Sequence, residues 1–273
     1  MTLGPRTLVM GILNVTPDSF SDGGRFLDAS AAVEHALEMA EDGADIIDVG
    51  GESTRPGADS VPAAEELRRV VPVIERICAA TAVHVSIDTT KPEVARAALA
   101  AGASIVNDVT GLHADAALAR VAAEFCAPVV AMHIKGTPRT MQQHPVYYDL
   151  MGEIAAYLRR SIAIAVENGV PASQVIVDPG IGFGKTVRHN LEVMARLGEL
   201  ASLGRPILVG SSRKSTIGKV TGKPPGRRTY GTAATIAICI ANGASIVRVH
   251  DIAETLDVVN MADAIRRWQE WKD

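Results

Sequence analysis

The sequence predicts a single α/β domain over residues 1–273, folded as a closed (β/α)8 barrel of the TIM type. Eight short apolar runs alternate with helical patterns along the chain, and such alternation favours parallel strands joined by helical crossovers. The length of 273 residues suits one barrel, and no Pro/Gly/Ser-rich linker divides the chain. An open doubly wound sheet is the alternative architecture.

Each expected strand is a short run rich in apolar and β-branched residues. In chain order the runs are LVMGILNV (8–15), GADIIDVG from Gly43, VHVSI (83–87), GASIVNDVTG from Gly102, PVVAM (128–132), VIV (175–177), PILV (206–209) and GASIVRVHD from Gly243. Three of them share one phrase, which follows an alanine-rich helical stretch. We expect its glycine to close the helix and the strand to start two residues later.

Composition favours an enzyme that acts on small molecules. The chain is 47% hydrophobic and carries a formal charge of -4 with no basic block, so nothing in it favours nucleic acid or a membrane as partner. The apolar run 8–15 is too short to span a bilayer and lacks the flanking residues of a cleaved signal. A cytoplasmic location is therefore expected.

Two further features concern thiols and loops. Cys78, Cys126 and Cys239 lie far apart in apolar helical contexts, which indicates reduced core thiols. Glycine and proline are frequent in residues 16–25 and 51–62. These segments predict mobile loops after the first two strands.

Polar residues end all eight expected strands. They are Asn14, Asp48, Asp88, Asn107 with Asp108, His133, Asp178, Ser211 to Lys214, and Arg248 with His250. In a barrel the carboxyl ends of the strands form the open face, so we expect these side chains to converge on one pocket. A helix N-cap is the alternative for a single strand-ending carboxylate such as Asp48 or Asp108, and it applies to Asp88 and Asn107 as well.

The usual motifs of other chemistries are missing. The stretch VIVDPGIGFGKT (175–186) resembles a phosphate-binding loop, but Pro179 stands where that motif needs its first glycine. No strand end carries G-x-S-x-G, H-E-x-x-H or a cysteine. Lys185 and Lys214 leave a Schiff-base mechanism as an alternative, although both lie in loop segments.

Several motifs closely resemble the dihydropteroate synthase family. They are GILNVTPDSFSDGG (11–24), DVGGESTRPGA (48–58), SIDTTKP (86–92), NDVTG (107–111), MHIKGTPRTMQ (132–142), DPGIGFGKT (178–186), SSRKS (211–215) and RVHD (248–251). The resemblance runs from residue 8 to about residue 255. One departure is Ile134-Lys135, where many members read M-H-M-Q-G-T, and these positions flank the pterin end of the site.

The resemblance implies the reaction of 6-hydroxymethyl-7,8-dihydropterin diphosphate with 4-aminobenzoate, which gives 7,8-dihydropteroate and pyrophosphate for tetrahydrofolate synthesis. It implies a pterin site made of Asp88, Asn107, Asp178, Lys214 and Arg248. A carboxylate such as Asp178 suits a dihydropterin, because it accepts hydrogen bonds from the amino group and the ring NH together.

The resemblance also implies a diphosphate site of Asn14, Arg55, Arg248 and His250, with Asn14 as a ligand of Mg²⁺. The residues implied for 4-aminobenzoate are Phe20, Thr54, Arg55, Pro56, Phe183, Lys214 and Ser215. Arg55, Lys214, Arg248 and His250 are the implied catalytic residues.

The leaving group indicates how catalysis proceeds. Pyrophosphate leaves readily once its charge is neutralised, so we expect an SN1-like substitution that depends on electrostatic stabilisation and positioning. Sulfonamides, as mimics of 4-aminobenzoate, are expected inhibitors, and family precedent suggests a homodimer. A pterin-binding methyltransferase and a non-catalytic pterin binder are the alternatives.

Overall fold

The eight apolar runs all form strands in the computed structural model, which describes residues 4, 6–16, 25–54 and 57–270, apart from the side chains of residues 25–28. The strands are β1 (Leu8–Asn14), β2 (Ile46–Gly50), β3 (His84–Asp88), β4 (Ile105–Asp108), β5 (Val129–Met132), β6 (Val175–Asp178), β7 (Leu208–Val209) and β8 (Ile246–Val249). All pairings are parallel, in the order β6-β5-β4-β3-β2-β1-β8-β7.

The sheet closes on itself. A parallel bridge joins Val177 of β6 to Ile207 beside β7, which are the two ends of that strand order. Closure satisfies the edge strands that an open sheet would expose. The prediction of a barrel is therefore confirmed, and the open doubly wound sheet is excluded.

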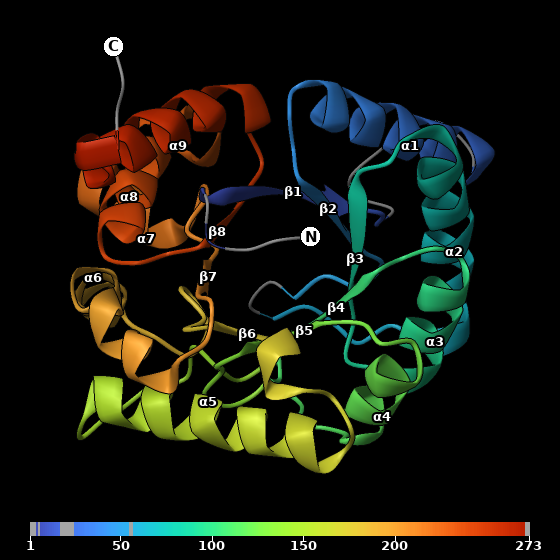
Figure 1. Cartoon of the computed structure of the whole chain (residues 1–273), viewed down its shortest axis with the longest axis horizontal. Coiled ribbons are helices and arrows are strands. Elements are labelled where there is room, and N and C mark those ends of the chain that lie inside the picture. The colour runs from blue at the N-terminus through green and yellow to red at the C-terminus, as the bar shows by residue number, and fades with distance from the viewer. Residues whose placement is uncertain (1–3, 5, 17–24, 55–56, 271–273) are drawn as a thin grey trace.

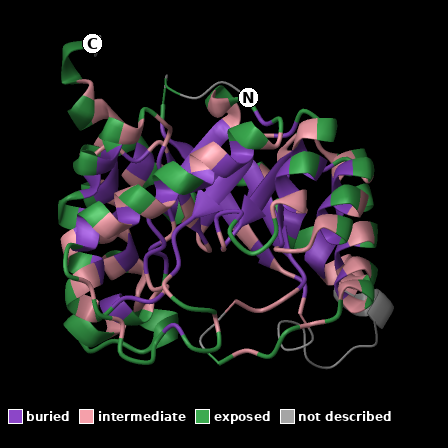
Figure 2. Ribbon diagram, turned by 90° about the horizontal axis from the view of Figure 1, so that it is seen from below, coloured by how far each residue is buried: buried purple, intermediate pink, exposed green. Residues whose placement is uncertain are grey.

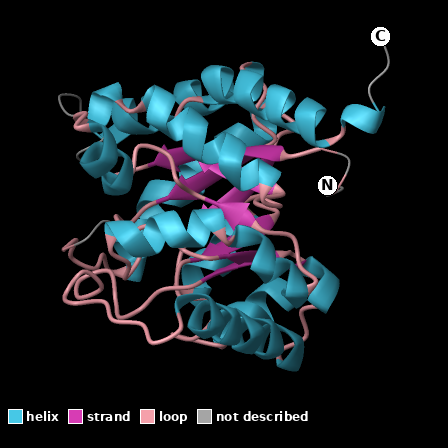
Figure 3. Ribbon diagram, turned by 90° about the vertical axis from the view of Figure 1, so that its left-hand side faces the viewer, coloured by secondary structure: helices cyan, strands magenta, loops and turns pink. Residues whose placement is uncertain are grey.

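Helices surround the strands on the outside of the barrel (Figure 1, Figure 3). In the described residues they are α1 (Arg25–Glu41), α2 (Ala63–Ala80), α3 (Pro92–Ala100), α4 (Ala117–Glu124), α5 (Leu150–Glu167), α6 (Val187–Ala195), α7 (Ser215–Thr221), α8 (Thr229–Ala241) and α9 (Ile252–Arg266). Short 3-10 turns occur at Ala172–Gln174, Leu197–Leu203, Pro225–Arg227 and Trp268–Glu270. The strict alternation breaks once, because both α7 and α8 follow β7.

The repeated phrase acts as predicted, with a small shift. Gly43, Gly102 and Gly243 have φ of 97°, 112° and 104°, a region where a side chain would be strained, so glycine is needed to end each helix. The strands begin three residues after these glycines, one later than expected. The intervening residues are nevertheless bonded to the neighbouring strand, as the Ser104 N–H to Val85 carbonyl bond of 2.8 Å shows.

Alternation along each strand divides the barrel interior into two levels. Side chains two residues apart face the same side of a strand, so Leu8 and Met10 of β1 point inward below Ile12 and Asn14. The lower level is a buried apolar cluster, and the strands appear as the buried centre of Figure 2. Its members are Leu8, Met10, Ile46, Ile105, Val130, Ile176, Leu208 and Ile246.

The outward faces of the strands pack against the helices. One apolar cluster joins β1–β5 to the helices around them, and Val49, Ile87 and Val106 belong to it. A second surrounds β6 and β7, where Val177 and Val209 meet residues of α5 and α6. A well-filled barrel held from both sides gives rigid strand ends, which is what positions the side chains described below.

The cysteines differ from expectation in one case. All three are free thiols; Cys239 is buried, Cys78 is half-buried, and Cys126 is exposed. The prediction of a core thiol is wrong for Cys126, because it follows the end of α4 in the turn to β5, with a φ of 53° that turns the chain outward. In the helices that the structure describes, none is long and apolar enough to cross a bilayer.

The two loops predicted to be mobile lie partly outside the described residues, so their mobility stays a prediction. The base of the second loop is tied to the barrel. The Lys91 ammonium donates to the Glu52 carboxylate and, at 2.5 Å, to that of Glu66 on α2. Glu52 also accepts the Val61 N–H at 3.1 Å, so it links the two ends of the loop.

Loss of this buried cation should destabilise the fold. Glu66 is fully buried, so Lys91→Met leaves an unpaired buried carboxylate and should lower the free energy of unfolding by about 3 kcal/mol or more. The measurement is urea unfolding followed by circular dichroism. Arg96→Met is the matched control, since the Arg96–Glu124 pair is about half exposed and its loss should change stability far less. Equal losses in the two variants would contradict the assignment.

Candidate active site

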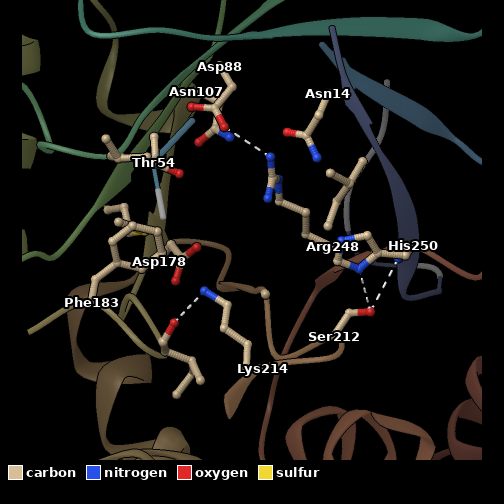
Figure 4. A pocket seen from close by; sticks show the side chains of 15 residues that line it. Asn14, Thr54, Asp88, Asn107, Asp178, Phe183, Ser212, Lys214, Arg248 and His250 are labelled. Carbon is tan, nitrogen blue, oxygen red and sulfur yellow. Dashed lines mark hydrogen bonds and ion pairs between the residues drawn. The ribbon is translucent and has the colours of Figure 1, made fainter. Parts of the chain in front are cut away.

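A polar pocket opens at the carboxyl ends of the strands (Figure 4). It lies above the apolar lower level of the barrel, where the inward positions of the strands change from aliphatic to polar side chains. The residues that line it are Ile12, Asn14, Thr54, Asp88, Asn107, Val109, Met132, Asp178, Ile181, Phe183, Gly210, Ser212, Lys214, Arg248 and His250. A mixture of charged, amide and apolar groups in one concave site is typical of a small-molecule pocket.

Only some of the polar strand ends reach this pocket. Asn107 and Met132 face it, and the next residue on each strand, Asp108 and His133, points the other way because side chains alternate. Asp108 instead accepts the backbone N–H groups of Thr110 and Leu112 at 2.8 and 2.7 Å and so holds the following turn. The prediction that all strand-end polar groups converge is therefore wrong for Asp108 and His133. It is also wrong for Ser211 and Arg213, which contact Thr235 and Asp251 and do not line the pocket.

The helix-cap alternative fails for the inward-facing residues. The N-cap of α3 is Lys91 and that of α4 is Ala116, and neither helix has a side-chain cap. Asp88 and Asn107 instead face the pocket. These two side chains therefore do not cap helices, and helix stability does not explain why they are buried inside the barrel.

Arg248 lies at the centre of an acidic cluster. Its Nε donates to Asp48 at 2.6 Å and its Nη2 donates to Asp88 at 2.9 Å. The same Asp48 oxygen accepts from the Asn107 amide at 3.0 Å. Asp48 is fully buried and touches both pocket residues from below, so it orients the guanidinium and the amide together.

The cluster perturbs the ionisation of its members. Burial and the nearby Asp48 carboxylate raise the pKa of Asp88 to about 7, because together they outweigh the attraction of Arg248. Burial by itself would lower the pKa of Arg248, but Asp48 and Asp88 reverse that effect and raise it. The pocket thus holds a permanent cation beside a carboxyl group that can exist in either form near neutral pH.

Asp178 and Lys214 form the opposite wall (Figure 4). Burial raises the pKa of Asp178, and the Gly180 N–H, which donates to its Oδ1 at 2.7 Å, works against that shift. The Lys214 ammonium donates to the Ile181 carbonyl at 2.6 Å and lies 4.3 Å from the centre of the Phe183 ring. Burial lowers the pKa of Lys214 to about 8, so it is largely protonated at neutral pH.

His250 is held in its neutral form beside Arg248. Burial, followed by the charges of Arg213 and Arg248, lowers the pKa of His250 to about 4. Its Nδ1 is 2.9 Å from the Ser212 Oγ, which also accepts the His250 N–H at 3.3 Å. The hydroxyl donates to Nδ1 in the tautomer that carries the ring proton on Nε2.

The structure places most of the residues that the sequence assigned to the site around this one pocket. The predicted residues that line it are Asn14, Thr54, Asp88, Asn107, Asp178, Phe183, Lys214, Arg248 and His250. Phe20, Arg55 and Pro56 lie outside the described residues. Ser215 is exposed at the first position of α7 and does not line the pocket, so its contact with 4-aminobenzoate stays a prediction.

Sequence reasoning included Ser212 and Asp48 among the converging strand ends but assigned neither a role. Ser212 lines the pocket and orients His250, and Asp48 supports the pocket from below. The apolar members of the lining were missed. Counting in steps of two from Asn14 would have found Ile12, and the same step from Asn107 finds Val109. The contact of Asp48 with Arg248 joins residues 200 positions apart, and no local pattern signals it.

The fold and the pocket together define a (β/α)8-barrel enzyme with a site for a small polar ring. Residues 10–250 match the family of pterin binding enzymes. The dihydropteroate synthase of Synechocystis sp. is 49% identical over 265 residues, covering 97% of this chain and 92% of that protein. The chain therefore belongs to the dihydropteroate synthase family of transferases.

Solved structures of similar proteins agree with this family assignment. A dihydropteroate synthase structure from Clostridium difficile, obtained in the presence of pteroic acid, has a TM-score of 0.92 and 48% identity over 97% of this chain and 98% of that chain. The enzyme from Xanthomonas albilineans with 4-aminobenzoic acid has a TM-score of 0.90 and 46% identity, covering 98% of this chain and 95% of that one.

Neutralising Asp48 should change the ionisation of its neighbour. Because Asp48 is a like charge that disfavours ionisation of Asp88, Asp48→Asn should lower the pKa of Asp88. The measurement is a carboxyl-carbon NMR titration of the free protein. Asp108→Asn, which neutralises a more weakly coupled carboxylate that faces away from the pocket, should shift it less. An unchanged or raised pKa in Asp48→Asn would refute the coupling.

Proposed function

We propose that this chain joins 6-hydroxymethyl-7,8-dihydropterin diphosphate to 4-aminobenzoate, and that the polar pocket is where it does so. The observation that supports this most is the division of the pocket. Asp178, Asn107 and Lys214 offer acceptors and donors for a heteroaromatic ring, while Arg248, His250 and Asn14 offer an anion site beside them. A pterin diphosphate carries both kinds of group in one molecule.

Recognition of the pterin falls to Asp178. Its carboxylate accepts the amino group and the adjacent ring NH together, and these two donors favour the ionised form that burial opposes. Asn107, held by Asp48, and Asp88 serve the remaining edge atoms, and Lys214 donates to the ring carbonyl. A ligand without these donors would leave buried groups unpaired, at about 1–3 kcal/mol each.

The diphosphate would lie between Arg248 and His250. Arg248 gives a guanidinium for phosphate oxygens, and the neutral His250 offers its Nε2 proton. Arg55 is proposed for the same site, although it lies outside the described residues.

Mg²⁺ is the proposed metal, with Asn14 as its protein ligand. The described residues contain no group of three His, Cys, Asp or Glu side chains that could form a closed metal site. One amide oxygen at the pocket wall fits Mg²⁺, which keeps its waters and binds substrate phosphates. When bound, the ion would neutralise charge on the departing diphosphate.

The proposed reaction is a dissociative substitution. The bond between the pterin methylene and the diphosphate oxygen breaks, and its electron pair leaves with pyrophosphate. The positive charge that spreads over the dihydropterin is stabilised by the carboxylates of Asp178 and Asp88 around the ring. The amine of 4-aminobenzoate then forms the C–N bond and loses its proton to solvent.

The arylamine needs an apolar slot next to that methylene. Phe183 and the stem of Lys214 lie together at the pocket edge, and Thr54 closes it from the β2 side. The expected contacts with Phe20, Pro56 and Ser215 would complete this slot. Loops that cover it would exclude water, which otherwise traps the cation.

A release assay tests the reaction. Sustained release of pyrophosphate should require both substrates and Mg²⁺, and chelation of the ion should abolish it. A sulfonamide should compete with 4-aminobenzoate.

Asp178→Asn replaces one acceptor by a donor facing the pterin amino group, so it should weaken pterin binding about a hundredfold and keep the fold. No release with both substrates and Mg²⁺ present, or unchanged pterin affinity in Asp178→Asn, would count against the proposal.

We also propose that the chain forms a homodimer through α8 and α9. These helices pack against each other at one side of the barrel (Figure 1). They carry large apolar residues that are between 53% and 93% exposed, namely Tyr230 and Ile238 of α8 and Met261 and Ile265 of α9. Trp268, in the 3-10 turn after α9, is 69% exposed. Such a concentration of apolar surface favours a self-complementary interface.

Charge placed on this surface should separate the subunits. Ile238→Glu with Ile265→Glu should sediment as a monomer in analytical ultracentrifugation at micromolar concentration, because two carboxylates cannot be buried unpaired. Phe125→Glu, at an exposed apolar site after α4, is the matched control and should stay dimeric. A monomeric wild-type protein would overturn the proposal.

A further inference from the structure

Lys185 is a buried cation that the proposed reaction leaves unused. It belongs to the glycine-rich turn after β6, and its side chain is directed away from the pocket lining. Lys185 is 2% exposed. Its Nζ lies 2.8 Å from Nδ1 of His133, 2.9 Å from the carbonyl oxygen of Gly180 and 3.1 Å from that of Phe183.

The number of hydrogen bonds matches a protonated lysine. An ammonium has three donors, and Lys185 has three acceptors within reach. His133 acts as an acceptor because burial, and then the charge of Lys185, lower its pKa to about 2 and keep it neutral. A neutral amine has two N–H groups, so loss of the proton removes one of the three bonds.

The turn depends on contacts of this kind for its shape. Gly180, Gly182 and Gly184 have φ of 69°, 85° and 62°, and glycine in these conformations costs more backbone entropy to order than other residues. The turn also packs against the end of β5, since a Cβ at Gly180 would lie 1.9 Å from the His133 carbonyl oxygen. The buried Lys185 ammonium binds the backbone of the turn on the side that faces away from the pocket.

The same turn forms one wall of the pocket. Ile181 and Phe183 alternate with the glycines and line the pocket, and Lys214 binds the Ile181 carbonyl. Lys185 binds the carbonyls of Gly180 and Phe183, which flank that wall on either side. Displacement of either carbonyl therefore moves the surface on which the pterin ring is expected to lie.

We propose that Lys185 is a positioning residue whose ammonium holds the turn 179–186 in the shape that binds the pterin. The inference rests on the proposed function for the identity of the ligand and on the contacts above for the mechanism. Lys185 touches no reacting atom. It acts through Gly180 and Phe183 on the pocket wall.

The hydrogen bonding of Lys185 to the turn is expected to weaken near neutral pH. Burial lowers the pKa of Lys185 to about 7, although Asp178 partly opposes this and Lys214 adds to it. Charged or titratable groups face this region from the surrounding elements. They are Asp178 at the end of β6, Lys214 before α7, His133 and Lys135 after β5, Tyr147 before α5 and His189 of α6. Full positioning is therefore present at pH values below about 7 and is lost as the pH rises above it.

Binding of pteroic acid by calorimetry tests the proposal at pH 6 and pH 8.5. At the lower pH, Lys185→Met should bind about tenfold more weakly than wild type or worse, because the bonds of a charged donor are lost. At the higher pH the ratio should be smaller, since wild type has then lost its ammonium and one of the three bonds. Arg205→Met is the matched control, because Arg205 donates to the Ala172 carbonyl away from the pocket, and it should leave the affinity unchanged.

A ratio that does not change with pH would overturn the proposal, as would an equal loss in Arg205→Met. The amide NMR signals of Gly180, Gly182 and Gly184 in the ligand-free wild-type protein give a second readout that does not depend on the variant folding. They should titrate between pH 6 and 8.5, and signals that do not move contradict the positioning role. Failure of the wild-type protein to bind pteroic acid would count against the proposed function, and glycine signals that do not titrate would still contradict the role of Lys185. A titration that persists unchanged in Lys185→Met would belong to Lys214, which binds the same turn, and would also overturn the proposal.

Discussion

Closure of eight short parallel strands into a barrel is the constraint on which the rest of this structure depends. A closed barrel allows each short strand only a few inward positions, and alternation decides which residues occupy them. The lower inward positions are aliphatic, which stabilises the barrel, and the upper ones are polar, which makes a site. Fold and function thus use different levels of the same strands.

The polar level is held by interactions among its own members. Asp48 contacts Arg248 and Asn107, and Arg248 contacts Asp88, so four strands share one network of charge-assisted hydrogen bonds. Such a buried network costs desolvation, and its members hold each other in place before any ligand arrives. Preorganisation of this kind suits a reaction that proceeds through charge separation, because the surroundings need not rearrange as the charge develops.

The glycine turn after β6 contributes a second, softer wall. Its backbone carbonyls are bound from one side by Lys214 and from the other by Lys185. Both lysines have a pKa lowered by burial, so the shape of this wall is linked to the protonation of its cations. In the Arg248 network the cation keeps its proton, and Asp88 is the group whose ionisation changes near neutral pH. An arginine could not provide that link, because it stays protonated at all physiological pH values.

The sequence by itself determined the barrel, its eight strands and the identity of most pocket residues. Local period and glycine position decide strand and helix, and the motifs DPGIGFGKT and RVHD are distinctive enough to indicate a family. The sequence did not determine which of two adjacent polar residues faces inward, as for Asn107 and Asp108, or that Cys126 would be exposed. Only the tertiary structure decided these points, and it alone paired Asp48 with Arg248 and Lys185 with His133. The physical reason is that strand register and contacts between distant segments arise when the barrel closes, and no short stretch of sequence contains them.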